Sequence, residues 1–482
     1  MTLSELLEGL EVTETQGNIG VKISGIAFNS NEVKPGYVFV CIEGFKADGH
    51  DFAADALEKG AVAIVAQKKI QDVAATMVIV PNTRLALAKI AAIYYGHPYK
   101  EFTLMGVTGT NGKTTTTYLV KTILENCGQK VGLVGTNQNM IGDEIIPSHH
   151  TTPDSLELME LFRKMADEKV DTVIMEVSSH SLALDRVAAL RFEVSAFTNV
   201  TQEHLDFHET MENYINAKSM LFKKCRKAVL NSDDDAYEKI AGNCNCDIMN
   251  YGCENAADLK AMNVVYKSNG VEFDISYKGE KERVNLAIPG RFSVYNALTA
   301  AGCCLAAGQS LSQVVEGLGV ARGVKGRIEV VETNTDYTVI IDYAHTPDGL
   351  LNILNTIRGF AKGRIVTLFG CGGDRDKTKR PKMGRIAGEL SDFCVVTSDN
   401  PRTEDPRAII NDVLAGISET DCEYVVVENR FEAIEFALDN AKTDDIILLA
   451  GKGHETYQIL KDRTIVFDER EIVQKLIDSS DA

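Results

Sequence analysis

Runs of apolar and polar residues divide the chain into three regions. In residues 1–98, short apolar runs predict strands, and residues 52–59 have helical spacing. In residues 326–482, apolar runs alternate with helical segments, which is typical of a Rossmann-like, doubly wound parallel sheet. A chain of 482 residues is too long for one hydrophobic core. We therefore predict an α/β protein with three domains, at residues 1–98, 99–325 and 326–482.

The middle region begins with an apolar strand, a glycine-rich turn and a helix expected from Thr115 to about residue 126. Gly109 and Gly112 would let main-chain N–H groups close on a phosphate, Lys113 would add a charge, and Thr114 a hydroxyl for Mg²⁺. Val107 stands where the strict phosphate-loop pattern has glycine, so this is a variant. The alternative is a plain turn without a ligand. The pattern favours a P-loop-type mononucleotide-binding domain for ATP or GTP.

Two further features of the middle region suggest metal binding. The apolar run 171–176 ends in Glu176, and phosphate-loop enzymes often hold Mg²⁺ with such an acid. The alternative is a carboxylate that faces water. His204 and His208 are four residues apart and could share a helix face, but no third ligand has zinc spacing. A histidine beside Mg²⁺ or the nucleotide is the better interpretation.

Polar clusters follow the predicted strands of the C-terminal region. They begin at Asp342, Gly370, Ser398 and Gly451. Ligands of doubly wound sheets bind at the carboxyl ends of the strands. Each cluster alone could be a turn, but the set predicts a binding site along one sheet edge. Near the N-terminus, residues 28–36 could form a binding loop or an ordinary turn.

Composition narrows the class of protein. The formal net charge is −19 without a long basic run, which argues against nucleic acid or anionic membranes as partners. No apolar run reaches the roughly 18 residues of a membrane span, and the start does not resemble a signal peptide. The 11 cysteines lack zinc spacing and are best interpreted as reduced thiols. We expect a cytoplasmic protein, and a monomer.

Several motifs together resemble the Mur ligase family, the cytoplasmic ATP-dependent enzymes that add amino acids to the peptidoglycan precursor. They are Thr108-Gly-Thr-Asn-Gly-Lys-Thr-Thr115, Met175-Glu-Val-Ser-Ser-His180, Thr198-Asn-Val-Thr-Gln-Glu-His-Leu-Asp206, Asp342-Tyr-Ala-His-Thr-Pro347 and Gly370-Cys-Gly-Gly-Asp-Arg375. The resemblance covers essentially the whole chain. It implies a first domain for the UDP end of the substrate, a second for ATP and a third for the incoming amino acid. It also implies a role in cell-wall synthesis, and so in cell shape and division.

The resemblance implies roles for individual residues. ATP would be held by Gly109, Thr110, Asn111, Gly112, Lys113, Thr114, Thr115, Asn296, Arg327 and Asp342. A UDP-muramoyl dipeptide would contact Ser30, Thr151, Thr152, Ser178 and Arg186. Many relatives read Asp-Ser-Arg around Ser30, whereas this chain reads Asn29-Ser30-Asn31. Catalysis would depend on Lys113, Lys218 and His204, and Mg²⁺ on Thr114, Glu176, His204 and Lys218.

Lys218 matches a lysine that relatives carry as a carbamate (N6-carboxylysine), a carboxylate-like anion that can bind or orient Mg²⁺. Judged by its neighbours alone, Lys218 would be a lysine on a helix surface. The chemistry that the resemblance implies is transfer of the γ-phosphoryl group of ATP to a substrate carboxylate. The amine of the new residue then attacks the acyl phosphate.

The resemblance is greatest to members that add the third residue to UDP-N-acetylmuramoyl-L-alanyl-D-glutamate. Members that add meso-diaminopimelate carry the sequence Asp399-Asn400-Pro401-Arg402, and Arg402 can bind a second carboxylate through two parallel N–H···O bonds. The expected amino-acid site is Arg375, Asp399, Asn400, Pro401, Arg402, Gly451 and Glu455. Alternatively, Arg402 forms a surface ion pair with Glu404 or Asp405 and says nothing about the substrate.

Other functions are open at this point. A ligase that adds L-lysine would need no second carboxylate contact. Folylpolyglutamate synthetase has a similar phosphate loop, but the extra N-terminal region and the Asp399–Arg402 cluster argue against it. A nucleotide-gated switch or a small-molecule kinase would also use a phosphate loop.

Overall fold

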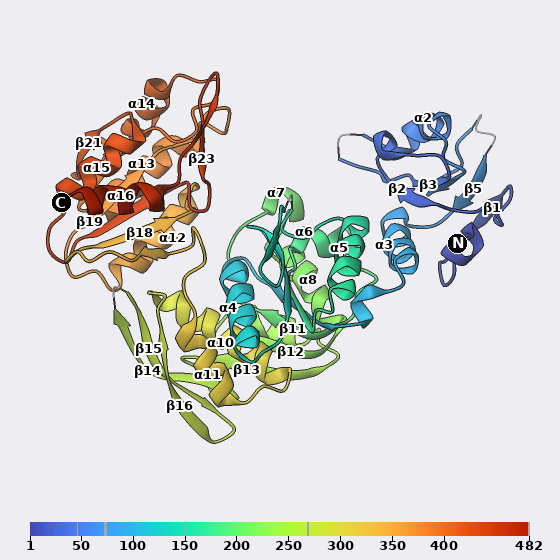
Figure 1. Ribbon diagram of the computed structural model, residues 1–482, viewed down its shortest axis with the longest axis horizontal. Helices are drawn as coiled ribbons and strands as arrows, with labels where there is room; N and C mark the ends of the chain where they lie inside the picture. The colour runs from blue at the N-terminus through green and yellow to red at the C-terminus, as the bar shows by residue number, and fades with distance from the viewer. Residues whose placement is uncertain (46, 72–74, 149, 268, 481–482) are drawn as a thin grey trace. The chain divides into compact units, whose positions relative to one another are not determined.

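The computed structural model describes residues 1–45, 47–71, 75–148, 150–267 and 269–480 (Figure 1). The described chain forms two compact units. One contains Met1–Tyr251 and Gly302–Gln309, and the other contains Gly252–Ala301 and Ser310–Ala482. The first unit holds two sheets, which are described in turn, and the second holds an antiparallel ribbon and a parallel sheet.

The N-terminal sheet is covered on both faces. Its order is β1-β5-β4-β3-β2, parallel except for β1, with α1 and α3 packed on one face and α2 on the other. The predicted strands and helix are confirmed, whereas the edge strands β1 and β2 were not predicted. The strands are β1 (Glu14–Gln16), β2 (Gly25–Ala27), β3 (Tyr37–Val40), β4 (Ala63–Ala66) and β5 (Thr76–Ile79). The helices are α1 (Leu3–Leu6), α2 (Ala53–Glu58) and α3 (Thr83–Tyr94), with short 3-10 turns η1 (Ser30–Glu32), η2 (Gly49–Phe52) and η3 (Pro98–Lys100).

The second sheet of this unit carries the phosphate loop on a central strand. Its order is β13-β12-β11-β6-β10-β7-β8-β9, parallel from β13 to β7 and antiparallel beyond. The strands are β6 (Thr103–Thr108), β7 (Val131–Val134), β8 (Asn139–Ile141), β9 (Glu144–Ile146), β10 (Thr172–Glu176), β11 (Phe192–Phe197), β12 (Cys225–Asn231) and β13 (Asp247–Gly252). The helices are α4 (Lys113–Asn126), α5 (Ser155–Asp167), α6 (Ser179–Ala183), α7 (Leu205–His208), α8 (Met211–Ser219) and α9 (Tyr237–Ala241), with the 3-10 turn η4 (Met220–Lys223).

The second unit begins with an antiparallel ribbon. The pattern of residues 264–277 predicts only a small antiparallel segment, whereas the ribbon is longer and has a third strand. Two helices follow the ribbon in sequence. The elements are β14 (Leu259–Lys267), β15 (Gly270–Tyr277), β16 (Glu280–Leu286), α10 (Arg291–Ala306) and α11 (Leu311–Val320).

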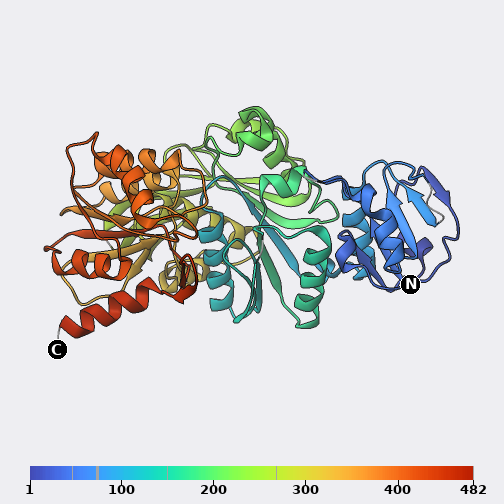
Figure 2. The ribbon, with the colours of Figure 1, turned by 90° about the horizontal axis from the view of Figure 1, so that it is seen from above.

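The C-terminal sheet confirms the doubly wound prediction (Figure 2). Its order is β17-β18-β22-β19-β20-β21, and only β17 is antiparallel. Apolar residues of α12, α13 and α14 pack on one face, and those of α15 and α16 on the other. The strands are β17 (Glu329–Val331), β18 (Thr338–Asp342), β19 (Ile365–Phe369), β20 (Phe393–Val396), β21 (Glu423–Val426) and β22 (Ile446–Ala450), with a hairpin of β23 (Tyr457–Ile459) and β24 (Thr464–Val466). The helices are α12 (Pro347–Arg358), α13 (Lys379–Leu390), α14 (Pro406–Ile417), α15 (Arg430–Asp439) and α16 (Glu469–Ser480).

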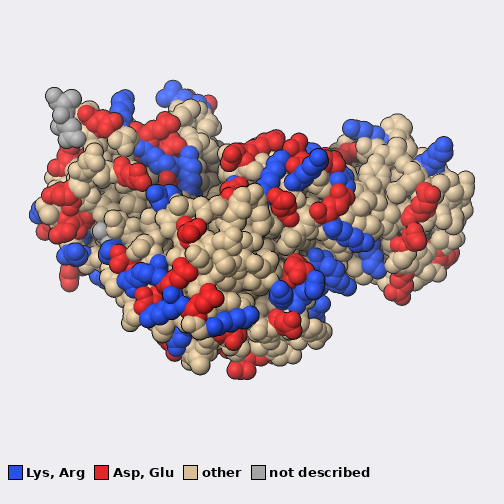
Figure 3. All heavy atoms as spheres, turned by 60° about the horizontal axis from the view of Figure 1, so that its bottom comes forward, with Lys and Arg blue, Asp and Glu red and all other residues tan. Residues whose placement is uncertain are grey.

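The surface mixes both signs of charge. Acidic and basic side chains are interspersed over the face that Figure 3 shows. Within the described ranges, none of the helices combines the length and apolar character that crossing a bilayer would require. The cysteines carry free thiols, as the sequence predicted.

Candidate active site

The phosphate loop joins β6 to α4 and is closed by two glycines. Gly109 has a φ of 153° and Gly112 a φ of 85°, which favour glycine. A Cβ at Gly109 would also lie 1.9 Å from Thr198 Oγ1. Helix α4 begins at Lys113, two residues before the predicted start at Thr115, so the N–H groups of its first turn face the loop. A helix N-terminus beside such a loop is suited to binding phosphate.

The segment after β11 holds the phosphate loop in shape. Thr110 N donates to Asn199 O at 2.8 Å, and Asn111 N donates to Asn199 Oδ1 at 2.9 Å. Lys113 Nζ lies over the loop, where it donates to Gly109 O at 2.9 Å and Thr110 O at 2.8 Å. Asn199 was not singled out from the sequence, because its contact with the loop depends on β11 lying beside β6.

Glu176 is buried at the end of β10 and does not face water. Its Oε1 accepts hydrogen bonds from Thr114 Oγ1 at 3.0 Å and from Thr136 N at 2.9 Å, and its Oε2 accepts one from Thr136 Oγ1 at 2.9 Å. A carboxylate and a hydroxyl side by side are hard oxygen ligands of the kind that Mg²⁺ prefers. These residues therefore fit a magnesium ion. Thr136 was missed, because its loop follows β7, another strand that is adjacent only in space.

Lys218 is buried on α8, which corrects the alternative of a lysine on a helix surface. Its side chain is 1% exposed, and Nζ lies 4.2 Å from the centroid of the Tyr214 ring. Burial, with the nearby charge of Lys113, holds the pKa of Lys218 well below its usual value. A neutral amine is the form that reacts with CO₂, so the surroundings suit a carbamate.

Histidine and aromatic rings gather around α7 and α8. The rings of His204 and His208 lie 4.8 and 5.5 Å from that of His180, and both also contact the Tyr214 ring. His208 is buried and its Nε2 lies 2.9 Å from Ser179 Oγ, whereas the side chain of His204 is 43% exposed. The described chain contains no group of three His, Cys, Asp or Glu side chains that could hold a metal ion.

Four of the five predicted muramoyl-dipeptide residues come together at the end of β10. Thr152 Oγ1 donates to Glu176 O at 2.8 Å and accepts from Ser178 N at 3.1 Å, while Arg186 Nη1 donates to Thr152 O at 2.9 Å. Thr151 Oγ1 lies 3.0 Å from Thr136 Oγ1. Ser30 lies in the N-terminal region, where it begins the 3-10 turn η1 between β2 and β3 and is 8% exposed.

The carboxyl ends of β18, β22, β19 and β20 meet at one edge of the C-terminal sheet, so the four polar clusters gather as predicted. Asp342 is buried and accepts hydrogen bonds from Ile328 N and Ala344 N, both at 2.8 Å. The guanidinium of Arg327 lies 5.2 Å from the Tyr343 ring, which also contacts His345 and His454. Burial raises the pKa of Asp342. Asn296 is buried on α10.

Three of the predicted amino-acid residues, Asp399, Asn400 and Glu455, form a polar network around Lys452. Lys452 is fully buried, and its Nζ lies 3.1 Å from Asn400 Oδ1, 3.3 Å from Asp399 Oδ1 and 3.7 Å from Glu455 Oε2. Asn400 Nδ2 donates to Glu455 Oε2 at 2.9 Å. Lys452 belongs to the predicted polar cluster that begins at Gly451, but its burial was not predicted, because a glycine-flanked lysine after a strand is usually solvated. Gly451, with a φ of 116°, brings the main chain close to Asp399.

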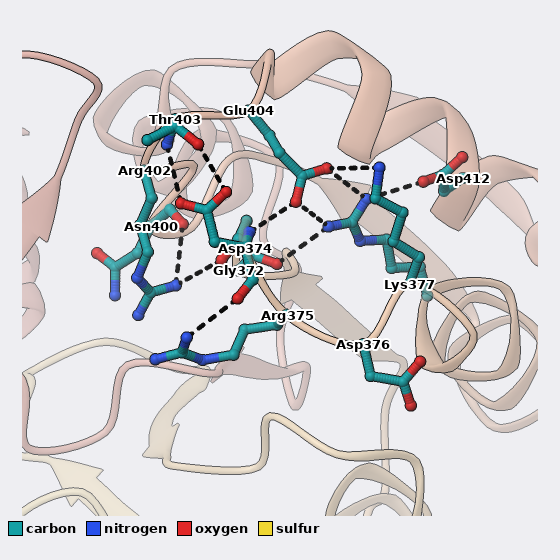
Figure 4. Close-up of polar contacts among 12 residues, drawn as sticks. Gly372, Asp374, Arg375, Asp376, Lys377, Asn400, Arg402, Thr403, Glu404 and Asp412 are labelled. Atoms are coloured by element: carbon teal, nitrogen blue, oxygen red, sulfur yellow. Dashed lines mark hydrogen bonds and ion pairs between the residues drawn. The ribbon is translucent and has the colours of Figure 1, made fainter.

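Arg402 does not form the surface ion pair that was considered as an alternative. Its Nη1 donates to the carbonyls of Gly373 at 2.9 Å and Asn400 at 3.4 Å, and no carboxylate of the described chain forms an ion pair with it. Glu404 instead pairs with the buried Arg380, at 2.8 Å. Arg375 Nη1 donates to Asp374 O at 3.0 Å. In Figure 4 the side chains of Arg375 and Arg402 extend to the same side.

Comparison with known proteins identifies the family. Residues 22–95 match "Mur ligase family, catalytic domain", residues 107–304 match "Mur ligase middle domain", and residues 326–453 match "Mur ligase, glutamate ligase domain". UDP-N-acetylmuramoyl-L-alanyl-D-glutamate--2,6-diaminopimelate ligase of Clostridium botulinum is 51% identical, with 99% of each chain covered. The enzyme of the same name from Caldanaerobacter subterraneus is 50% identical, with both chains fully covered.

A solved structure of a UDP-N-acetylmuramoyl-L-alanyl-D-glutamate--2,6-diaminopimelate ligase superposes on this chain with a TM-score of 0.76 at 30% identity. The superposition covers 100% of this chain and 99% of the other. The matches therefore extend over all three predicted regions and over the phosphate loop, Glu176 and the C-terminal strand ends. The chain belongs to the Mur ligase family.

Proposed function

We propose that this chain is the ATP-dependent amide ligase that adds meso-2,6-diaminopimelate to UDP-N-acetylmuramoyl-L-alanyl-D-glutamate during peptidoglycan precursor synthesis. The observation that supports meso-diaminopimelate as the added amino acid concerns the partners of the Arg402 guanidinium. Its guanidinium donates to carbonyls and, among the described residues, has no carboxylate ion partner, at the sheet edge where an amino acid would bind. The full-length relatives that are about half identical act on the same substrates by name.

The residues of the phosphate loop bind and orient ATP. The N–H groups at the start of α4 and the Lys113 ammonium would bind the outer phosphates, and Asn296, Arg327 and Asp342 are the further ATP contacts that we propose. Thr114, Glu176, His204 and a carbamylated Lys218 would hold Mg²⁺, which when bound neutralises phosphate charge. The buried contact of Glu176 with Thr114 and the low pKa of Lys218 support this assignment.

The proposed reaction requires ATP, the UDP substrate and the incoming amino acid to be held next to one another. A carboxylate is a poor acylating agent, so the substrate carboxylate first takes the γ-phosphoryl group and becomes an acyl phosphate. The amine of the incoming amino acid then attacks its carbonyl carbon, and phosphate leaves. Lys113 stabilises the transferring charge, while Thr151, Thr152, Ser178 and Arg186, with Ser30, position the substrate. The cluster of four of these residues beside Glu176 supports that role.

Charge complementarity favours diaminopimelate over L-lysine. Arg375 and Arg402 can each take one carboxylate, and Glu455 with the Gly451 main chain can take the distal ammonium. L-Lysine would leave Arg402 facing an ammonium. Such a mismatch costs on the order of 2–5 kcal/mol, or roughly 30- to 5,000-fold in selectivity.

The remaining assignments concern the whole molecule. We propose domains at residues 1–98 for the UDP substrate, 99–325 for ATP and 326–482 for the amino acid; three family-model matches, one within each range, support this division. A location in the cytoplasm, where ATP is available, is supported by the free thiols, and we propose that the chain is a monomer there.

Release of ADP tests the proposed activity. With ATP, Mg²⁺, UDP-N-acetylmuramoyl-L-alanyl-D-glutamate and meso-diaminopimelate, ADP should form, and omitting either co-substrate should stop its formation. Lys113→Ala should abolish it while circular dichroism stays unchanged. ADP release from ATP alone would indicate a switch, and release that requires a folate and glutamate would indicate a folylpolyglutamate synthetase. Either result would contradict the proposal.

A further inference from the structure

We infer that Asp374, Glu404 and Arg380 form a clamp that fixes the two guanidinium groups of Arg375 and Arg402 relative to one another, and so sets selectivity for an amino acid with two carboxylates. The inference rests on the proposed function. The three side chains are called the loop clamp below. They are positioning residues, and they join the loop after β19, which carries Arg375, to the loop after β20, which carries Arg402.

Asp374 and Glu404 bind the two loops to one another reciprocally. Asp374 N donates to Glu404 Oε1 at 2.6 Å, so an acid of the second loop holds the main chain of the first. In return, Thr403 donates to the Asp374 carboxylate, from N at 3.2 Å and from Oγ1 at 2.7 Å. Figure 4 shows these bonds between the two loops. Each loop therefore uses one carboxylate to fix the backbone of the other.

Arg380 anchors this pair to two helices. It lies on α13 with its side chain 1% exposed, and it binds both oxygens of Glu404, at 2.8 and 3.1 Å. Its Nη1 also donates to Asp412 Oδ2 on α14 at 2.9 Å. A bidentate guanidinium–carboxylate pair fixes orientation as well as distance. The nearby Arg380 and the Asp374 N–H lower the pKa of Glu404 to about 2, so the carboxylate stays charged at neutral pH.

The loop backbones meet so closely that their geometry depends on these contacts. Gly373 N donates to Asn400 O at 2.9 Å, and a Cβ at Gly373 would lie 1.9 Å from Pro401 O. Asp374 and Arg402 both have left-handed backbones, with φ of 54° and 52°. Non-glycine residues adopt this conformation only where surrounding contacts hold them in it.

The loop clamp positions both Arg375 and Arg402, because each guanidinium donates a hydrogen bond to one of two successive main-chain carbonyls in the same loop. Arg402 Nη1 donates to Gly373 O at 2.9 Å, and Arg375 Nη1 donates to Asp374 O at 3.0 Å. Figure 4 shows both guanidinium groups on one side of the loops, while Glu404, Lys377 and Asp412 lie on the other. A shift of the main chain at Gly373 and Asp374 would therefore move both groups. A substrate with two carboxylates depends on that spacing, whereas L-lysine uses one carboxylate contact.

Steady-state kinetics of Asp374→Ala and Glu404→Gln test the clamp. We expect the KM for meso-diaminopimelate to rise on the order of 10- to 100-fold, since small misplacements of binding groups cost this much. The KM values for ATP and for the UDP substrate should stay close to the parent values, and the preference over L-lysine should fall. Thr403→Val, which removes one hydroxyl contact, should show a smaller change in the same direction.

Control measurements distinguish a loss of the loop clamp from a general loss of folding and from a failure of the proposed function. Arg385→Ala removes two exposed ion pairs, with Glu389 on the same helix and with Glu419, and should leave the KM values and the selectivity unchanged. Unfolding temperatures identify variants that are misfolded, and Thr403→Val then decides the outcome. If the parent enzyme shows no preference for meso-diaminopimelate, the proposed function fails. If the parent is selective but the folded variants keep its KM and selectivity, the clamp is refuted.

Discussion

Thr114 Oγ1 donates a hydrogen bond to Glu176 Oε1 at 3.0 Å, although the two residues are 62 positions apart. The contact exists because β10 pairs with β6 in parallel, so the end of one strand lies beside the phosphate loop that follows the other. A hydroxyl and a carboxylate are thereby held together at the start of α4. The same pair is the core of the proposed magnesium site.

Glu176→Gln should weaken the binding of Mg²⁺ and so raise the Mg²⁺ concentration that the reaction requires. The amide keeps the shape of the side chain but removes the charge that would bind the cation. We expect the Mg²⁺ concentration for half-maximal ADP release to rise by at least about tenfold. Titration of Mg²⁺ in the ligase assay measures this. The matched control is Glu168→Gln, which changes an exposed acid after α5. An unchanged Mg²⁺ requirement in the Glu176 variant would refute its role as a ligand.

Lys218→Met should separate activity from stability. Burial disfavours the ammonium form of Lys218, so an apolar side chain of similar length should leave the unfolding temperature unchanged or raise it. Activity should fall by at least about 100-fold, since the carbamate is lost. The parent equilibrated with ¹³C-labelled bicarbonate should show a carbamate signal by NMR that the variant lacks. Lys223→Met, at an exposed position of η4, should behave like the parent; near-parental turnover by the Lys218 variant would rule out the assignment.

His208 should make the fold less stable in mild acid. Burial, with nearby His180 and Lys218, lowers the pKa of His208 to about 4, below its usual value of 6.5. Between pH 6.5 and 4 the unfolded chain binds a proton that the folded chain excludes, so stability falls with pH in that window. His208→Gln should reduce the loss between pH 7.5 and 5 by about 1 kcal/mol, allowing for solvent screening. Urea unfolding at both pH values measures it, and equal losses would contradict the expectation.

Arg402→Ala should remove the preference for diaminopimelate. The variant cannot bind the second carboxylate, so kcat/KM for meso-diaminopimelate should fall by roughly 30- to 5,000-fold, with little change for L-lysine. Arg402→Lys should recover part of the loss, because an ammonium supplies charge but no parallel pair of N–H donors. Arg407→Ala, which removes an exposed arginine at the start of α14, is the control. A variant that kept the parental preference would show that another residue selects the substrate.

The sequence predicted best those features that are contiguous along the chain. The phosphate loop, the alternation of the C-terminal region and the clusters at its strand ends each depend on a local pattern, and all are present in the structure. Errors there are limited to boundaries, as at the start of α4. The edge strands β1 and β17 were missed because each has only three residues, and β1 is polar and exposed.

Contacts between segments that are far apart in the sequence could not be predicted, because the sequence does not reveal the order of the strands in a sheet. Thr136 and Asn199 reach the phosphate-loop region through the strands β7 and β11, which precede them. Glu404 was considered as a partner of Arg402, but α13 buries Arg380 beside it, and the bidentate pair forms there instead. The burial of Lys218 was likewise not predicted, because it depends on α8 packing against α6 and α9.

A competition between meso-diaminopimelate and L-lysine as the added amino acid tests the proposed function most directly. The enzyme is supplied with ATP, Mg²⁺, UDP-N-acetylmuramoyl-L-alanyl-D-glutamate and equal concentrations of meso-diaminopimelate and L-lysine, and the product is identified by mass spectrometry. We expect the diaminopimelate adduct to form in excess of at least about 30-fold, with one ADP released for each product. Equal amounts of both adducts, or a product that contains lysine alone, would contradict the central claim that paired arginines select a second carboxylate.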